Sequence, residues 1–147
     1  MGLDMFLTIE KFIWNSDKQI MNKSLGIEED LDLGRCESLT FEFMYWRKAN
    51  AIHKWFVDNI QNGEDKCEKH SVSIEKLKGL LDLVKEVLKD RSKAKELLPC
   101  QEGFFFGGKE YNEWYFHQLK YTRKRLNYLF KNLMKFKGFD FYYRSSW

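Results

Sequence analysis

The sequence has 147 residues, of which 44% are hydrophobic and 17% aromatic, so it suits a single folded domain spanning residues 1–147 and excludes a disordered chain. Its 25 lysines and arginines and 22 acidic residues give a net charge of +3, which is too balanced to make long nucleic acid an expected partner. No apolar run approaches the roughly 18 residues of a membrane-spanning helix, so we expect no membrane partner.

The three cysteines, at positions 36, 67 and 100, are odd in number and widely spaced, and no hydrophobic signal segment opens the sequence. This pattern is typical of proteins from a reducing compartment, so we expect a cytoplasmic protein. The positive charge is concentrated in residues 120–137, which include seven lysines and arginines and no acidic residue. That stretch indicates either a solvated helix face or a patch that faces phosphate.

Two segments in the first third of the chain have the alternation of a half-buried strand. Residues 3–14 alternate between apolar and polar side chains, and residues 37–44 do so again. The apolar face of the first segment consists of Leu3, Met5, Leu7 and Ile9. The polar stretch between them, residues 15–35, predicts a long excursion with room for a short helix.

The middle of the chain predicts two helices. Residues 45–60 have helical spacing and end before Asn62-Gly63, a usual helix C-terminus. Ser73 is suited to cap a second helix, and a short helical turn after it ends at Pro99. The apolar stripe of the second helix consists of Leu77, Leu80, Leu81, Val84, Val87 and Leu88.

The last third predicts the longest helix, residues 111–136, followed by an aromatic strand at residues 138–145. The helix has a packing seam with alternating gaps of four and three, formed by Tyr115, Leu119, Thr122, Leu126, Leu129 and Leu133. We therefore predict an α+β fold. About three main helices should pack on a small antiparallel sheet formed by the N-terminal, middle and C-terminal strands.

Two polar residues in the first predicted helix interrupt its apolar face. On a helix covering residues 45–60, Asn50 and His53 lie among apolar residues, with Trp46 on the same face and Arg47 at its edge. Burying such groups without hydrogen bonds costs about 1–3 kcal/mol each. The pair is therefore either a satisfied core pair or the polar floor of a ligand pocket.

A glycine-bounded aromatic segment, residues 99–108, is the second candidate. Its glycines allow backbone to approach a ligand closely, and the N–H groups leading into the next helix are suited to bind an anion. The segment is either a buried strand or plug, or a pocket wall formed by Gln101, Glu102 and one phenylalanine. We predict that this segment and the helix bearing Arg47, Asn50 and His53 face each other across one cavity.

Enzyme signatures are weak. The chain has no GxxxxGK[ST], GxGxxG, GxSxG or HExxH motif, so we expect no catalytic cluster and no cofactor. The Cys67-x-x-His70 spacing is too unspecific to predict a metal site. His53 is still able to act as a general acid or base, because the ordinary pKa of histidine is near neutral.

Three blocks of the sequence resemble a family of small tailed-phage proteins: MGLDMFL at residues 1–7, YWRKANAIHKWFV at 45–57 and ELLPCQEGFFFG at 96–107. The resemblance implies a phage protein acting in the bacterial cytosol. Small phage proteins are often counter-defence factors, and some are sponges, oligomers that trap nucleotide-derived immune signals without cutting them.

The expected function is therefore to sequester a small phosphorylated, nucleotide-like ligand. Aromatic faces stack on bases, and arginine forks bind phosphate oxygens. The alternatives are a nucleotide-processing enzyme that uses His53 and a protein–protein inhibitor of a host defence factor. We also expect a homo-oligomer, because the long helix has apolar side chains outside its seam and the last strand is a potential edge. The predicted ligand-binding residues are Tyr45, Trp46, Arg47, Lys48, Asn50, His53, Gln101, Phe105 and Gly107.

Overall fold

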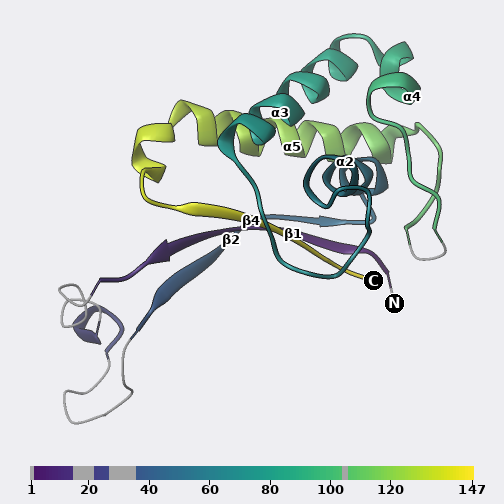
Figure 1. Cartoon of the computed structure of the whole chain (residues 1–147). Coiled ribbons are helices and arrows are strands. Elements are labelled where there is room, and N and C mark those ends of the chain that lie inside the picture. Colours follow the sequence, from purple (N-terminus) through teal and green to yellow (C-terminus); the bar gives the residue numbers. More distant parts are fainter. Residues whose placement is uncertain (1, 15–21, 27–35, 104–105) are drawn as a thin grey trace.

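The structure, a computed structural model, describes residues 2–14, 22–26, 36–103 and 106–147. Four strands form one antiparallel sheet in the order β2-β1-β4-β3 (Figure 1). β1 (Asp4–Phe12) lies between β2 (Ser38–Arg47) and β4 (Asp140–Ser146), while β3 (His70–Ser71) pairs with the other side of β4. The N-terminal, middle and C-terminal strands thus form the predicted sheet, and the α+β fold class is confirmed.

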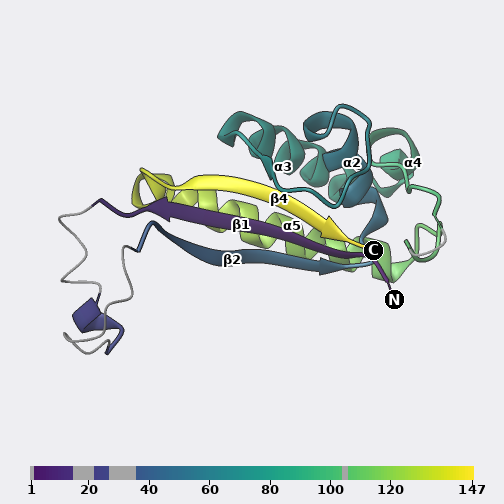
Figure 2. The same cartoon turned by 60° about the horizontal axis from the view of Figure 1, so that its bottom comes forward.

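Three long helices, α2 (Asn50–Ile60), α3 (Ile74–Lys89) and α5 (Glu113–Lys131), lie on one face of the sheet, as does the short α4 (Ala94–Leu97). Figure 2 shows the opposite face, where β2, β1 and β4 are open. No helix in the described part of the chain is long and apolar enough to cross a membrane.

The alternation in β1 places apolar side chains toward the helices and polar ones on the open face. The buried set consists of Leu3, Met5, Leu7 and Ile9. The side chains between them are half-buried: Asp4, Phe6, Thr8 and Glu10. Since successive side chains of a strand point to opposite faces, the predicted N-terminal strand is confirmed with its predicted orientation.

The capping signals also act as expected. Ser73 Oγ accepts the backbone N–H of Lys76 at 3.3 Å and begins α3. The predicted seam of α5 is buried, except for Leu133, which is 38% exposed. The helix ends at Lys131, five residues earlier than residue 136 of the prediction, and Leu133–Phe136 form a separate 3-10 turn.

Side chains of α5 cover part of the free edge of β2. The backbone N–H of Tyr45 donates to the Tyr121 hydroxyl at 3.3 Å, and the Arg125 guanidinium donates to the Phe43 carbonyl at 2.7 and 3.2 Å. The same guanidinium lies 4.5 Å from the centre of the Phe43 ring. Because β2 is the end strand of the sheet, these side chains take the hydrogen-bonding positions of an absent strand.

The predicted start of the first helix was wrong. Residues 45–47 continue β2, in register with β1, with Tyr45 opposite Phe6 and Arg47 opposite Asp4. α2 begins only at Asn50, after a turn in which Lys48 has a φ of 54°. Cross-strand pairing and the burial of the Trp46 indole outweigh the helical spacing of this block. Trp46 and Arg47 therefore do not share a helix face with Asn50 and His53.

Three other predictions concern residues 63–70, the C-terminal strand and residues 15–35. Part of the predicted charged loop at residues 63–70 pairs as β3, because His70 lies opposite Tyr143. β4 is an interior strand between β1 and β3, so it is not the open edge that the sequence suggested. Residues 22–24 are helical, whereas the rest of the predicted excursion at residues 15–35 lies outside the described residues, apart from residues 25 and 26.

Candidate functional site

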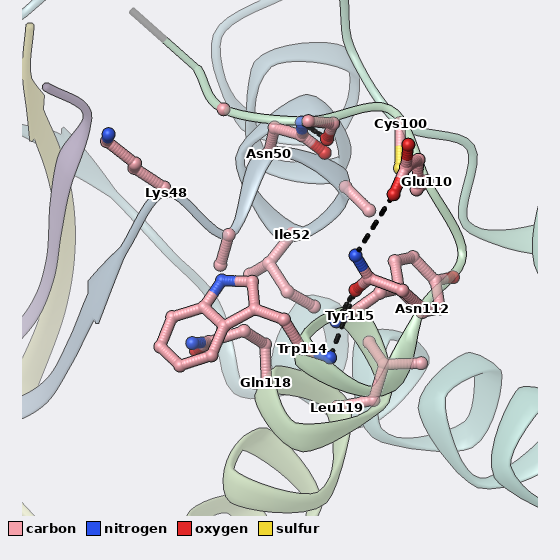
Figure 3. A pocket seen from close by; sticks show the side chains of 14 residues that line it. Lys48, Asn50, Ile52, Cys100, Glu110, Asn112, Trp114, Tyr115, Gln118 and Leu119 are labelled. Carbon is pink, nitrogen blue, oxygen red and sulfur yellow. Dashed lines mark hydrogen bonds between the residues drawn. The ribbon is translucent and has the colours of Figure 1, made fainter.

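A cavity of about 220 Å³ lies where the N-terminal ends of α2 and α5 meet the segment at residues 107–110. Figure 3 shows Asn50 and Ile52 of α2 facing Trp114 and Gln118 of α5 across this space. Its wall includes Lys48, Asn50, Cys100, Gly107, Gly108, Glu110, Asn112, Trp114, Tyr115 and Gln118.

The N-terminus of α2 is not capped. Its N-cap residue is Ala49, no side chain of the described residues accepts its N–H groups, and its first turn contains no acidic residue. The N-terminus of a helix has a partial positive charge of about half a unit, and its free N–H groups are suited to bind an anion. Lys48 lines the cavity beside this end, and its ammonium group extends away from the other lining side chains (Figure 3).

The N-terminus of α5 contrasts with that of α2. Asn112 Oδ1 accepts the backbone N–H groups of Trp114 at 3.0 Å and Tyr115 at 3.2 Å, so this end is capped (Figure 3). Glu110 lines the cavity on the same side. The positive end of the cavity is therefore at the uncapped N-terminus of α2, and the negative end is at Glu110 beside α5.

The glycine segment closes onto α2. The Asn50 amide donates to the Gly108 carbonyl at 2.9 Å, so this polar side chain fixes the loop that forms one wall. Gly107 has a φ of 90°, and a Cβ atom there would lie 3.3 Å from the Lys48 Cβ. Glycine is suited to this position because it has neither the conformational penalty nor the side chain.

A buried amide reaches the cavity from α5. Gln118 is 8% exposed, and its side-chain amide has no hydrogen-bond partner within the described part of the chain. Above it, Trp114 is 54% exposed and its indole stacks on His117 with ring centres 5.7 Å apart. The cavity leaves this amide open, so a ligand hydrogen bond would take the place of one to water.

Two titratable groups of the cavity wall, Cys100 and Tyr115, have raised pKa values. Burial raises the pKa of the Cys100 thiol, so the less reactive protonated form is favoured. Burial also raises the pKa of the Tyr115 phenol, which donates to the Leu98 carbonyl at 2.9 Å. This arrangement can bind a ligand by charge, hydrogen bonds and stacking.

The structure divides the predicted ligand-binding residues. Lys48, Asn50 and Gly107 line the cavity together, as the predicted meeting of the two segments requires. Tyr45 and Arg47 lie instead on the open face of the sheet, where they line a separate groove. Trp46, Gln101 and His53 do not line the cavity, and Phe105 lies outside the described residues.

Two of these residues have structural partners. Trp46 is buried, and its indole N–H donates to Thr122 Oγ1 at 2.8 Å. The imidazole of His53 is fully buried, with Nδ1 2.7 Å from the Tyr143 hydroxyl and Nε2 3.0 Å from Asp65 Oδ2. Burial lowers the pKa of His53, although Asp65 acts in the opposite direction. His53 is thus a core residue with both ring nitrogens bonded.

Sequence reasoning missed the contribution of α5. Gln118 lies on the buried face of that helix, between Tyr115 and Thr122 of the predicted seam. A polar residue on an apolar stripe was the signal that identified Asn50, and the same signal was present at Gln118. Trp114 gave no such signal, because an exposed aromatic near a helix start is common on protein surfaces.

The fold and the cavity define an α+β protein with a small cavity between two helix ends. Comparison with protein-family models, curated proteins and solved structures finds no match. Among the described residues, no group of three His, Cys, Asp or Glu side chains is placed to hold a metal ion.

Proposed function

We propose that the protein is a binding protein that sequesters a small phosphorylated, nucleotide-like ligand in this cavity without cleaving it. The observation that carries the proposal is the uncapped N-terminus of α2 beside Lys48, facing the unpaired amide of Gln118. One end of the cavity thus suits an anion, and the other suits a neutral group with hydrogen-bonding edges.

The charge distribution orients the ligand. A phosphate at the α2 end would accept the free N–H groups, and Lys48 would pair with it after its side chain turned toward the cavity. The same phosphate at the α5 end would face Glu110 and a helix N-terminus already occupied by Asn112. We therefore place the phosphate at α2 and the base against α5, where Gln118 can donate to and accept from its edge.

The size of the cavity limits how much of the ligand is enclosed. Pockets for drug-sized ligands have volumes of about 300–1,000 Å³, so a cavity of 220 Å³ encloses only part of a nucleotide. The remainder would extend past the exposed face of Trp114, whose indole offers a stacking surface. A base stacked on an aromatic side chain gains about 1–3 kcal/mol.

The biological role rests on the resemblance to small tailed-phage proteins. In that setting the ligand is a nucleotide-derived immune signal of the bacterial host, and trapping it in the cytoplasm counters the defence. Sequestration is favoured over an enzymatic reaction that uses His53, because the imidazole is buried and bonded to Tyr143 and Asp65 instead of facing the cavity.

We also propose that the protein is a homo-oligomer, on the basis of its exposed aromatic side chains. Toward the end of the sheet where β1 ends and β2 begins, Phe12, Trp14 and Phe41 are exposed, Trp14 to 70%. On α5, Tyr128 is exposed, whereas Phe116 is buried and lies under Arg91. The same exposed set favours inhibition of a host protein as the second candidate function.

Ligand capture tests the proposal directly. The purified protein is incubated with a small-molecule extract of bacterial cells, washed and denatured, and the released compounds are identified by mass spectrometry. An intact phosphorylated nucleotide supports sequestration. A converted product would instead indicate an enzyme, and release of no compound would contradict the proposal.

Matched tryptophan variants locate the site. Trp114→Ala should capture about fivefold to 150-fold less ligand, the equivalent of about 1–3 kcal/mol of stacking. Trp14→Ala removes another exposed tryptophan, two residues beyond the end of β1, and serves as the control. Equal capture by the two variants would exclude the cavity as the binding site.

A further inference from the structure

The open face of the sheet has a groove of about 450 Å³ at the end where β1 begins and β2 and β4 end. Its floor includes the rings of Phe6 and Tyr45, and its two arginines are Arg47 and Arg144. Figure 2 shows that β2, β1 and β4 lie side by side here with no helix over them. The groove is therefore separate from the cavity, which is on the helical side.

The register fixes the spacing of the arginines. Arg47 of β2 pairs with Asp4, and Arg144 of β4 pairs with Phe6, so the arginines flank β1 with an offset of two residues. Strands are about 4.8 Å apart and rise about 3.4 Å per residue, which places the two Cα atoms about 12 Å apart. A ligand bound by both arginines must pass over the Phe6 ring.

Phe6 and Tyr45 place two aromatic rings between the arginines, with their planes inclined by 43°. Their ring centres are 5.4 Å apart, and the Arg144 guanidinium lies 5.2 Å from the centre of the Phe6 ring. The Tyr45 hydroxyl donates to Asp4, and this hydrogen bond raises the pKa of the phenol. The acidic residue of the groove is therefore already occupied by a donor.

The arginines keep their charge available. Neither Arg47 nor Arg144 forms an ion pair with a described residue. Farther along the same face the charge changes sign, because Glu42 lies opposite Thr8 and Asp140 lies opposite Glu10. The positive surface thus extends over the two arginines and ends before the next acidic pairs.

We propose that this groove binds a nucleoside unit flanked by two phosphates, with the base stacked on Phe6 and Tyr45 and one phosphate on each arginine. Arginine guanidinium groups bind phosphate oxygens in a fork, and stacking on aromatic rings tolerates any base. Two sources supply this unit: a segment of single-stranded nucleic acid or a free nucleoside 3′,5′-bisphosphate. The acidic residues beyond the groove limit recognition to about one such unit.

The test measures fluorescence anisotropy of fluorescein-labelled, 5′-phosphorylated oligodeoxythymidylates of two, four and ten nucleotides. Corrected for the number of binding registers, the dissociation constants should agree within about threefold. Each phosphate contact to a single strand contributes a slope of about −0.7 in log affinity against log salt, so two contacts give about −1.4 at every length. A slope that grows with length would overturn the proposal.

Charge variants assign the contacts. Arg47→Ala and Arg144→Ala should each reduce the slope to about −0.7. Arg123→Ala, an exposed arginine on the helical side, removes the same charge and should leave the slope unchanged. The same salt slope in all three variants, or no binding by the native protein at millimolar concentration, would overturn the proposal.

Ring variants and a competitor complete the test. Phe6→Leu should weaken binding about fivefold to 150-fold through lost stacking, and Tyr45→Leu is the second variant if Phe6→Leu does not fold. Unchanged binding by the folded variants would overturn the stacking. Displacement by unlabelled thymidine 3′,5′-bisphosphate supports the free bisphosphate as ligand, and binding of oligonucleotides without displacement supports single-stranded nucleic acid. Trp114→Ala should bind these probes normally.

Discussion

Arg47 and Lys48 are consecutive in the sequence, yet one lies in the groove and the other in the cavity. Arg47 ends β2 and points to the open face because strand residues alternate. Lys48 follows in a left-handed conformation, with a φ of 54°, and turns the chain toward α2. The comparison shows that a single turn distributes adjacent charges between two chemically different surfaces.

The two regions also differ in how they are held. The groove is formed mainly by side chains of three strands, whereas the cavity depends on a loop fixed by Asn50 and on the position of α2. His53 connects them, because it belongs to α2 and bonds to Tyr143 of β4, the residue before Arg144. Substitutions of His53, of a cavity residue and of a groove residue should therefore have different effects on stability and binding.

His53→Ala should have the largest effect. It removes a fully buried ring and one hydrogen-bond partner each from Tyr143 and Asp65, so we expect a loss of about 3–5 kcal/mol in the free energy of unfolding. Urea denaturation measures this loss. A loss below about 1 kcal/mol would mean that His53 is not the connection between the two regions.

The same residue predicts a pH dependence. Burial lowers the pKa of His53 from its ordinary value of 6.5, so the folded protein favours the neutral ring. This contribution is fully present above pH 6.5 and is lost as the pH falls toward the folded-state pKa, with a maximum slope of about 1.4 kcal/mol per pH unit. Direct NMR titration of the imidazole checks the shift, and a pKa at or above 6.5 would contradict it.

Gly107→Ala should affect the cavity alone. The added Cβ would lie 3.3 Å from the Lys48 Cβ at a φ of 90°, so we expect about 1 kcal/mol of strain and reduced ligand capture. Gly138→Ala is the control, because its φ of 80° gives similar strain with no atom within 4 Å. If both variants capture ligand equally well, the Gly107 wall is not part of the site.

Arg47→Ala should have the smallest effect on stability. Its side chain is exposed and in no ion pair with a described residue, so the free energy of unfolding should change by less than about 0.5 kcal/mol. Ligand capture in the cavity should also stay unchanged. A loss of ligand capture would indicate that the groove and the cavity form one binding site.

Much of the fold was predictable because hydrophobic periodicity is a local signal. The alternation of β1, the stripe of α3 and the seam of α5 each determine which side chains are buried. The boundary between β2 and α2 was not predictable in the same way. Neither glycine nor proline marks it, and the pairing that keeps Tyr45 and Arg47 in a strand involves β1, about forty residues earlier.

The candidate site was predictable in part. The meeting of Asn50 with the glycine segment followed from two sequence features, an amide on an apolar face and glycines that permit close approach. The loss of Arg47 from the cavity follows from the strand boundary, since one residue of strand reverses the direction of a side chain. The uncapped end of α2 depends on the position of that same boundary.

The side chains that α5 places on the edge of β2 have a consequence for assembly. Tyr121 and Arg125 occupy the backbone groups of Tyr45 and Phe43, so a strand from another chain finds this stretch already satisfied. The earlier part of β2, residues 39–42, has no such cover from a described residue. Growth of the sheet across a subunit boundary would therefore begin at residues 39–42 and stop at Phe43. The side chains of helix α5 thereby limit how far the sheet can extend along the edge of β2.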